Sequence, residues 1–328
     1  MIDLDLISNI GKNAKSASRE LAKLSTRKKN SILESMAEAL ENDREFIKQE
    51  NAKDLDNGYK NGLSSSLLDR LELTDNRINS MINGIYDVIA LNDPVGEQIS
   101  AWDRPNGLHI KKVRSPIGVI CIIFESRPNV TCDAAVLCFK TSNAVILRGG
   151  KEAIFSNLAI ANSLKKGGVL KGMPEDAIQL IPTTDREAIR ILCRMTDHID
   201  LIMPRGGEGL INAVAEMSLV PVIKHYKGLC HTFVDFECDL EMALLIAENA
   251  KCQRPGVCNA METLLVHEKI ADEFLPNICK KFKDNGVEIR GDKYTHAICS
   301  DIILADDKDW HTEYLDLIIS IRVVKNID

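Results

Sequence analysis

The chain has 328 residues, of which 45% are hydrophobic and 27% charged, a composition typical of a globular protein with a large core. Its net charge of −7 argues against a nucleic-acid partner, which requires clustered positive charge. No apolar run is long enough for a membrane span, and the acidic start (residues 1–5) does not resemble a secretory signal.

Cysteine is frequent, with ten residues, but its spacing forms no framework. No Cys-x-x-Cys pair occurs, so neither a disulfide scaffold nor a metal site is predicted. Cys121, Cys132 and Cys138 lie in apolar surroundings that predict core thiols. Reduced cysteines of this kind favour a cytoplasmic location.

The first half of the chain changes from helices to alternating strands and helices. Residues 4–50 carry two amphipathic stripes with Ser25-Thr26 as an N-cap between them, and residues 51–95 continue as polar helices. Residues 108–113 alternate like a half-exposed strand, and residues 118–124 read as a buried one. Further strands are predicted at residues 144–147, 177–181, 199–203 and 220–223, with helices at 130–140, 151–165, 185–196 and 208–217. This order predicts a doubly wound, mostly parallel sheet that binds a nucleotide.

A second α/β set begins near residue 226, so we predict domains at residues 1–225 and 226–328. Its strands are expected at residues 231–235, 261–266, 287–290 and 317–324, and its helices at 239–249 and 268–284. The chain stops soon after the last strand. We therefore expect the second domain to be incomplete at its C-terminus.

Two glycine pairs each stand between a predicted strand and a predicted helix, where exposed N–H groups suit a phosphate. Taken singly, each pair is better explained as a tight βα turn. The second pair does not complete a Gly-x-Gly-x-x-Gly motif, because residue 212 is Asn. The candidate cofactor-binding residues at the two pairs are Arg148, Gly149, Gly150 and Lys151, and Pro204, Arg205, Gly206 and Gly207.

Cys258 lies in a turn between a predicted helix and a predicted strand, after a Pro-Gly pair that ends the helix. Lys251 and Arg254 nearby could lower the pKa of its thiol and make it a nucleophile. A small buried hydrophobic residue is the alternative, and the local sequence does not decide between them.

Residues 253–260, Gln-Arg-Pro-Gly-Val-Cys-Asn-Ala, resemble the nucleophile segment of the aldehyde dehydrogenase superfamily and most closely its γ-glutamyl phosphate reductase branch. The resemblance implies an aldehyde-dehydrogenase-like α/β fold with a Rossmann-type cofactor domain and an α/β catalytic domain. It also implies NADPH-dependent reduction of L-glutamyl 5-phosphate in proline biosynthesis, through a thioester on Cys258. A homo-oligomer at full length and handover of substrate from glutamate 5-kinase are implied as well.

The same resemblance assigns roles to cofactor residues. Arg148 takes the place of an adenosine-ribose lysine, and Lys151 lies near the position of a ribose-binding glutamate, a change that favours the 2′-phosphate of NADPH. Glu313 matches the glutamate that binds the nicotinamide ribose. Ungapped alignment puts Glu125 at the position of the oxyanion-binding asparagine, so we take Asn129 as the candidate for that role, with the Cys258 N–H as the alternative.

Hydrolytic relatives carry a glutamate base where this chain has His225, preceded by Lys224. An enzyme that starts from an acyl phosphate must keep water from its thioester, so the missing base fits. Lys224, His225, Arg127 and Arg254 are candidate contacts for the anionic substrate, although each could instead be structural. The alternatives are an NAD-dependent hydrolytic aldehyde dehydrogenase and a non-catalytic nucleotide-binding fragment.

Overall fold

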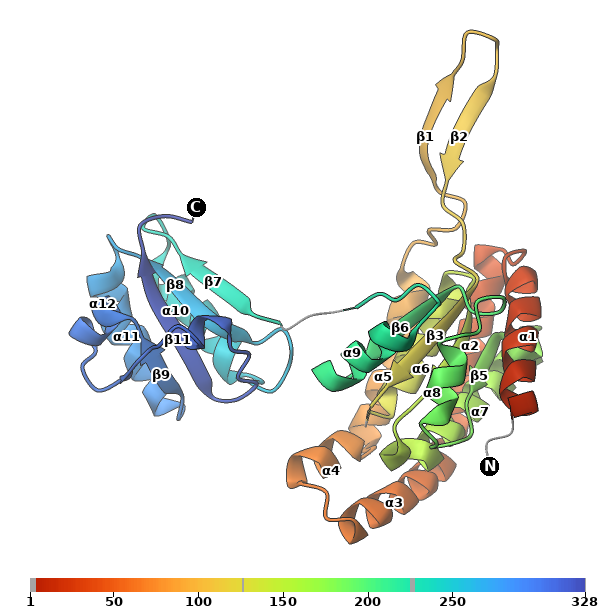
Figure 1. Cartoon of the computed structure of the whole chain (residues 1–328), viewed down its shortest axis with the longest axis horizontal. Helices are drawn as coiled ribbons and strands as arrows, with labels where there is room; N and C mark the ends of the chain where they lie inside the picture. Colours follow the sequence, from red (N-terminus) through yellow and green to blue (C-terminus); the bar gives the residue numbers. More distant parts are fainter. Residues whose placement is uncertain (1–3, 126, 225–227, 328) are drawn as a thin grey trace. The chain divides into compact units, whose positions relative to one another are not determined.

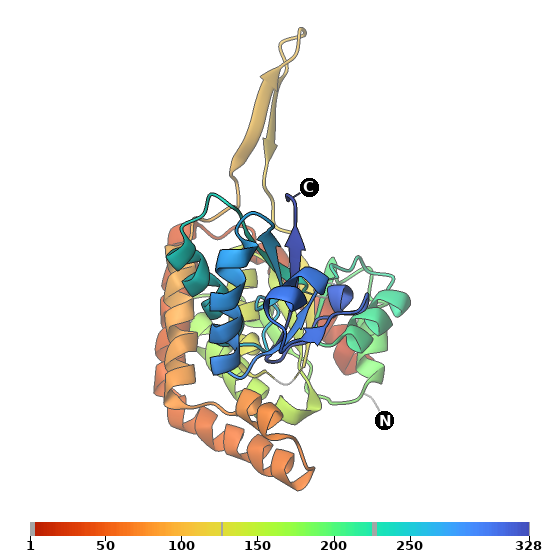
Figure 2. The same cartoon turned by 90° about the vertical axis from the view of Figure 1, so that its left-hand side faces the viewer.

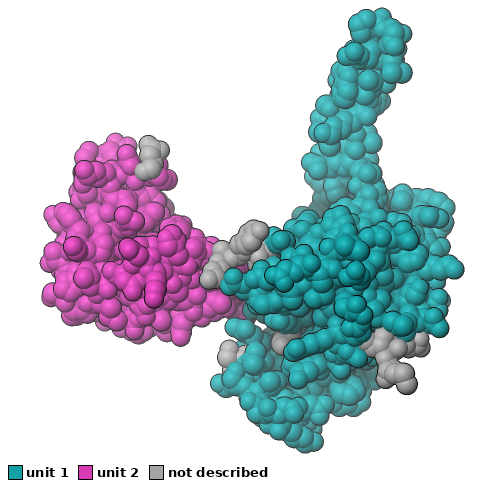
Figure 3. Space-filling model, in the orientation of Figure 1, with its two compact units in different colours: residues 1–225 teal, residues 226–328 magenta. Residues whose placement is uncertain are grey.

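The computed structural model describes residues 4–125, 127–224 and 228–327. The chain divides into two compact units, residues 1–225 and residues 226–328 (Figure 3). Each unit has its own hydrophobic core and its own parallel sheet.

Unit 1 begins with helices whose apolar stripes are buried as the sequence predicts. Ser25 caps the second of them, because its side chain accepts a hydrogen bond from the amide of Lys28, which confirms the predicted N-cap. The helices are α1 (Leu4–Leu21), α2 (Thr26–Asn42), α3 (Arg44–Lys60), α4 (Ser65–Leu71) and α5 (Asp75–Ala90).

An antiparallel hairpin follows, formed by β1 (Gln98–Asp103) and β2 (His109–Val113). It projects from the body of unit 1 in both views (Figures 1 and 2), and its strand residues are exposed apart from the half-buried Ile110. Gly107 has a φ of +83° in the turn, a conformation that favours glycine. The sequence predicts β2, whereas β1 was not predicted.

The sheet of unit 1 has the order β5-β4-β3-β6, with parallel pairing throughout. Its central strands β3 and β4 are buried along their whole length, as apolar strands covered on both faces must be. This arrangement confirms the predicted doubly wound fold. The strands are β3 (Val119–Phe124), β4 (Ala144–Arg148), β5 (Ile178–Leu180) and β6 (Leu201–Arg205), and the helices are α6 (Asn129–Lys140), α7 (Ile154–Leu170), α8 (Glu187–Leu192) and α9 (Glu208–Met217).

The strand predicted at residues 220–223 is wrong. Val222 forms a single parallel bridge with Ile202, at the edge of β6. The amide of Ile202 donates to the carbonyl of Pro221, and the amide of Ile223 donates to the carbonyl of Ile202. Pro221 itself has no N–H to contribute to a ladder, so the segment does not extend into a strand.

Unit 2 is built on a parallel sheet with the order β10-β9-β11-β8-β7. Its core lies between this sheet and the helices α10 and α11. The strands are β7 (Cys230–Val234), β8 (Met261–His267), β9 (Glu288–Gly291), β10 (Ile303–Leu304) and β11 (Ile318–Val324), and the helices are α10 (Leu240–Cys252), α11 (Ala271–Asp284) and α12 (Lys293–Ile298).

Candidate active site

Cys258 lies in the exposed turn that joins α10 to β8. Its side chain is a free, exposed thiol, so the alternative of a small buried hydrophobic residue is wrong. The core thiols behave differently, because burial raises the pKa of Cys138 to about 12 and that of Cys193 to about 11. Cys121 and Cys132 are buried as predicted, and burial raises their pKa values as well. A thiol held neutral in this way is a poor nucleophile, whereas the Cys258 thiol is exposed to solvent.

Gly228 lies where the backbone of Cys258 and the carboxylate of Glu313 come together. A methyl group at Gly228 would be 2.5 Å from the main-chain oxygen of Cys258 and 3.2 Å from Oε1 of Glu313. Only a residue without a side chain fits this place. The structure therefore brings the predicted nucleophile and the predicted ribose-binding glutamate to one point of unit 2.

Lys251 does not activate the thiol as the sequence suggested. Its ammonium group is fully buried and forms an ion pair with Glu262 at 2.9 Å, whose side chain is only 1% exposed. The other carboxylate oxygen of Glu262 accepts a hydrogen bond of 3.1 Å from the amide of Leu315. Leu315 has a φ of +53°, so this bond stabilises an uncommon backbone conformation just after Glu313. Glu262 thus ties both ends of the Cys258 turn to the Glu313 segment.

Tyr314 fixes the other side of the same segment. Its hydroxyl donates to Oδ1 of Asp309 at 2.9 Å and lies 2.8 Å from the hydroxyl of Ser320, and burial raises its pKa to about 12. Arg290 pairs with Asp309 at 2.7 Å and places its guanidinium over the ring of Tyr314. The two residues that follow Glu313 are therefore both anchored, which limits the positions open to its carboxylate.

In unit 1, the order of the sheet places the topological switch point between β3 and β6, where ligands of such sheets bind. Glu125 follows β3, and Gly206 and Gly207 follow β6. The carboxylate of Glu125 accepts a hydrogen bond of 3.0 Å from the amide of Gly207, at the start of α9. A methyl group at Gly206 would be 2.6 Å from Cδ of Glu125. An anionic oxygen thus already lies at this helix N-terminus, and Glu125 is exposed.

The glycine pair after β4 leads to a helix whose start is closed to a phosphate. Asp54, from α3, accepts hydrogen bonds from the amides of Phe155 and Ser156 in the first turn of α7. Asp54 is buried, which raises the pKa of its carboxyl group. A buried carboxylate therefore occupies the amides of Phe155 and Ser156 in the first turn of α7.

Arg148, at the end of β4, is a buried residue that braces the loops around it. Its guanidinium donates to the carbonyls of Gly149 and Thr184 at 3.0 and 2.9 Å. Gly149 is packed so closely that a methyl group would lie 2.1 Å from the amide nitrogen of Asn157. Lys151 is exposed, so it is the cation of this loop that can reach a ligand.

The remaining predicted residues occupy less defined positions. Asn129 begins α6, and its amide nitrogen donates to Asp133 at 3.0 Å, which restricts its use as an oxyanion donor. Arg127 and Lys224, in unit 1, and Arg254, in unit 2, are exposed. His225 lies outside the described residues. Pro204 is buried and Arg205 is exposed, both at the end of β6.

Sequence reasoning missed Gly228, Cys230 and Glu262. Cys230 begins β7, and its thiol donates to the main-chain oxygen of Cys258 at 3.4 Å. The signal for Gly228 and Cys230 was a glycine just before a strand, which marks a close approach of two backbones. Glu262 had a weaker signal, as the only carboxylate in the mostly apolar strand β8.

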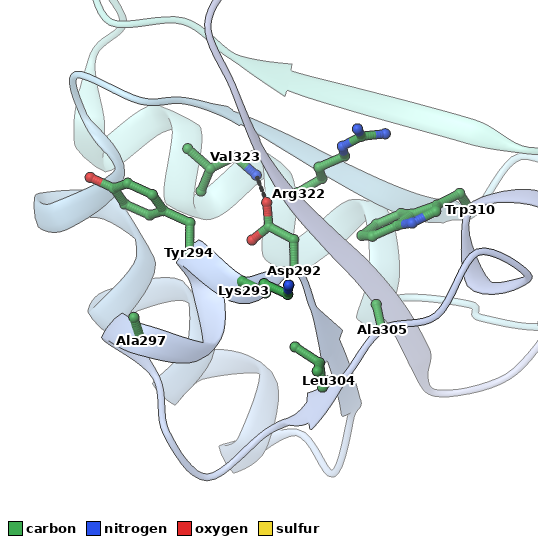
Figure 4. Close-up of a pocket in the computed structure, with 9 residues that line it drawn as sticks. All are labelled: Asp292, Lys293, Tyr294, Ala297, Leu304, Ala305, Trp310, Arg322 and Val323. Atoms are coloured by element: carbon green, nitrogen blue, oxygen red, sulfur yellow. Dashed lines mark hydrogen bonds between the residues drawn. The ribbon is translucent and has the colours of Figure 1, made fainter.

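A cavity of about 680 Å³ opens elsewhere in unit 2, beside α12 and β11 (Figure 4). It contains none of the predicted site residues. Arg322 lies over the ring of Trp310 at one side, and Asp292 accepts a hydrogen bond from the amide of Val323 at the other (Figure 4). The residues around it are Asp292, Lys293, Tyr294, Ala297, Leu304, Ala305, Trp310, Arg322 and Val323.

Within residues 4–125, 127–224 and 228–327, no group of three or more His, Cys, Asp or Glu side chains is placed to hold a metal ion. No helix in those same ranges has the length and apolar character required to cross a membrane.

The model of the "Aldehyde dehydrogenase family" matches residues 3–297. The chain belongs to the aldehyde dehydrogenase family. It is 55% identical to the γ-glutamyl phosphate reductase of Moorella thermoacetica, over 97% of this chain and 76% of the relative. It is 52% identical to the enzyme of the same name from Carboxydothermus hydrogenoformans, over 99% of this chain and 78% of the relative.

Solved structures of the aldehyde dehydrogenase family agree with this membership. The crystal structure of γ-glutamyl phosphate reductase from Thermotoga maritima superposes with a TM-score of 0.91 at 45% identity, covering 98% of this chain and 78% of that one. An acetylating aldehyde dehydrogenase from Geobacillus thermoglucosidasius shares the fold, with a TM-score of 0.65 at 16% identity, covering 98% of this chain and 76% of that one. The chain is thus an oxidoreductase of the aldehyde dehydrogenase fold.

The aldehyde dehydrogenase family uses a nicotinamide cofactor, and unit 1 fits one. The amide of Gly207 already binds a carboxylate oxygen at the switch point of the sheet, so the donor that a phosphate oxygen requires is present. Gly206 leaves no side chain in the way at the same loop. Arg205 and Lys151, both exposed, supply positive charge at the carboxyl ends of β6 and β4.

Proposed function

We propose that this chain reduces L-glutamyl 5-phosphate to L-glutamate 5-semialdehyde and phosphate, with NADPH, in proline biosynthesis. The observation that carries the proposal is the 55% identity to a γ-glutamyl phosphate reductase over 97% of the chain. The exposed thiol of Cys258 supports it, because the chemistry requires an accessible nucleophile.

In the proposed mechanism, the Cys258 thiolate attacks the acyl carbon of the substrate, and the C–O bond to phosphate breaks. The products of this step are inorganic phosphate and a thioester on Cys258. When bound, NADPH supplies the hydride that reduces the thioester to the aldehyde. The sulfur of Cys258 leaves as thiolate, and the semialdehyde then closes on its own amine to pyrroline-5-carboxylate.

Residues around Cys258 hold the reacting groups in place. The Lys251–Glu262 pair fixes the ends of the nucleophile turn, and Glu262 positions the segment of Glu313. Glu313 contacts the nicotinamide ribose in this proposal, and the Cys258 N–H or Asn129 stabilises the oxyanion. Positioning of this kind contributes to rate because the reacting atoms meet without further ordering.

The preference for NADPH over NADH rests on Lys151. Arg148 is buried and engaged with loop carbonyls, whereas Lys151 is exposed at the start of the next helical segment. A lysine in place of an acidic residue favours the 2′-phosphate. NADPH is therefore expected to support faster turnover than NADH at equal concentration, and a faster rate with NADH would overturn this part of the proposal.

Lys224, His225, Arg127 and Arg254 remain the proposed contacts for the substrate phosphate and carboxylate. Arg127 and Arg254 can each bind an anionic group in bidentate fashion. We propose that the thioester is protected from water because residue 225 is His and not a glutamate base.

The second candidate is a hydrolytic, NAD-dependent aldehyde dehydrogenase. The reverse reaction separates the two, since aldehyde oxidation by the proposed enzyme requires phosphate or arsenate as acyl acceptor. We expect NADP⁺ reduction with L-glutamate 5-semialdehyde to rise with phosphate concentration and to vanish without it. Phosphate-independent oxidation to glutamate would favour the hydrolytic enzyme, and NADPH binding without any turnover would favour a non-catalytic nucleotide-binding protein.

We also propose an oligomeric state, a cellular location and a partner enzyme for this chain. The β1–β2 hairpin exposes Ile99 and Trp102, at 50% and 46% exposed, and a lone two-stranded hairpin is marginally stable in water. We propose that a second copy of the chain covers it, making a homo-oligomer. A cytoplasmic location fits the ten free thiols, and a substrate as labile as an acyl phosphate fits handover from glutamate 5-kinase.

A further inference from the structure

Cys230 approaches the nucleophile turn more closely than its place in the sequence suggests. Its thiol lies 3.4 Å from the main-chain oxygen of Cys258. Parallel pairing of β7 with β8 puts Cys230 opposite Met261, at the end of the same turn. Gly228 brings the two backbones together, because any side chain there would collide with Cys258.

The turn is exposed at Cys258, whereas a buried ion pair joins its two ends. The buried Lys251–Glu262 ion pair joins α10 to β8 on either side of the turn, and β7 is paired with β8. Cys258 and Asn259 are exposed in the middle of the turn. Bringing the two sulfur atoms to bonding distance therefore requires side-chain rotation and a local shift, and the strands can stay paired.

Other thiols of unit 2 are less suited to react with Cys258. Burial raises the pKa of Cys238 and of Cys252, which keeps both as neutral thiols. Cys279 and Cys299 are buried in the core of the unit.

We propose that Cys230 is a resolving thiol that protects Cys258 from irreversible oxidation by forming a disulfide with it. The oxidant is hydrogen peroxide. The Cys258 thiolate attacks one peroxide oxygen, the O–O bond breaks, hydroxide leaves, and the sulfur becomes sulfenic acid. The Cys230 sulfur then attacks the Cys258 sulfur, the S–O bond breaks, and the oxygen leaves as water with the thiol proton. A dithiol reductant restores both thiols by exchange.

The proposal rests on the reactive Cys258 thiol of the proposed function, but not on the identity of the substrate. A thioester enzyme with a nearby second thiol can recover after oxidant exposure. Without that second thiol, Cys258 is oxidised further to sulfinic acid, and this step is irreversible.

The test compares wild type with Cys230→Ser, and with Cys238→Ser as the matched control, after exposure to hydrogen peroxide without added thiol. Free thiols are alkylated, and the protein is cut with trypsin and a glutamate-specific protease. Tandem mass spectrometry then distinguishes Cys230 from Cys238, and Cys258 from Cys252. The yield of iodoacetamide-reactive Cys258 is measured before and after dithiothreitol.

We expect a Cys230–Cys258 linked peptide in wild type and in Cys238→Ser, with most of the Cys258 thiol restored by dithiothreitol. In Cys230→Ser we expect Cys258 as sulfinic acid, with at least about ten-fold less thiol restored. The proposal is overturned if wild-type Cys258 oxidises while Cys230 stays alkylatable, or if Cys230→Ser recovers as well as wild type. These readouts use only the thiols, so a linked peptide in a protein without reductase activity would overturn the proposed function alone.

Discussion

Glu262 is the residue on which the geometry around Cys258 depends most. One carboxylate oxygen pairs with the buried Lys251, and the other accepts the amide of Leu315. Because both charges are removed from water, the pair is stabilising only while it is complete. Loss of one partner would leave the other charge buried without compensation.

Glu262→Gln is expected to lower the free energy of unfolding by about 3–5 kcal/mol, since the ammonium group of Lys251 then has no counter-charge. Chemical denaturation measures the change. Glu237→Gln, at an exposed position of the same unit, is the matched control and should stay within about 0.5 kcal/mol of wild type. A Glu262→Gln protein as stable as the control would contradict this account of the pair.

A substitution at Gly149 tests the close packing around this residue. In Gly149→Ala the new methyl group would meet the side-chain amide of Asn157, which forms a 2.9 Å hydrogen bond with Thr131. We expect a loss of about 1–3 kcal/mol, from overpacking of a buried site. Gly84→Ala is the control, because open space surrounds Gly84 in helix α5 and alanine there should stabilise by about 0.5–1 kcal/mol. Equal melting temperatures for the two variants would refute the packing argument.

Family resemblance identifies Cys258 and Glu313 from the sequence. The local sequence alone does not decide whether Cys258 is a nucleophile or a small buried hydrophobic residue. The structure decides for an exposed thiol. The role given to Lys251 could not be predicted from the sequence, because its partner Glu262 belongs to the following strand and the pair forms only once helix and strand are packed.

Among the elements, helices α7 and α9 look alike in sequence, since each follows a strand and a glycine pair, but they differ in the carboxylate that reaches them. Asp54 is buried against the start of α7, and Glu125 is exposed at the start of α9. A buried carboxylate is a permanent part of the fold, whereas an exposed one can be displaced by a phosphate. We therefore propose that the cofactor phosphate binds at the start of α9.

Glu125→Ala should bind NADPH about two- to five-fold more tightly, because a competing anion is removed from the helix N-terminus. Asp54→Asn should lower the melting temperature and leave NADPH affinity unchanged. Fluorescence titration and thermal unfolding measure the two quantities. Tighter NADPH binding in Asp54→Asn together with unchanged binding in Glu125→Ala would place the phosphate at α7 instead.

Most elements with strong periodicity are predicted correctly from the sequence, and each of the following misses has its own physical reason. Strand β1 is not predicted from the sequence because both faces of the hairpin are exposed, so its residues show no alternation between core and solvent. The predicted strand at residues 220–223 fails at Pro221, which lacks the N–H for a ladder. Tertiary capping by Asp54 and Glu125 has no local sequence signal at all.

For the molecule as a whole, composition and periodicity predict an α/β protein with a doubly wound sheet, and unit 1 confirms it. Within unit 1, the strands of the β1–β2 hairpin are exposed apart from the half-buried Ile110. If a second copy packs there, Trp102→Glu should shift the sedimentation coefficient toward the monomer and leave the melting of unit 1 unchanged. Lys111→Glu, on the neighbouring strand, is the control. An unaltered assembly in Trp102→Glu would contradict the proposed interface.

In the proposed mechanism, the sulfur of Cys258 takes the acyl group from the acyl phosphate and holds it as a thioester until hydride reduces it. The most direct measurement is NADPH oxidation with freshly generated L-glutamyl 5-phosphate, in wild type and in Cys258→Ala, with NADPH binding as the check on folding. We predict turnover with release of phosphate in wild type and at least about a thousand-fold loss in Cys258→Ala, with NADPH still bound. Undiminished reduction by Cys258→Ala would contradict the account.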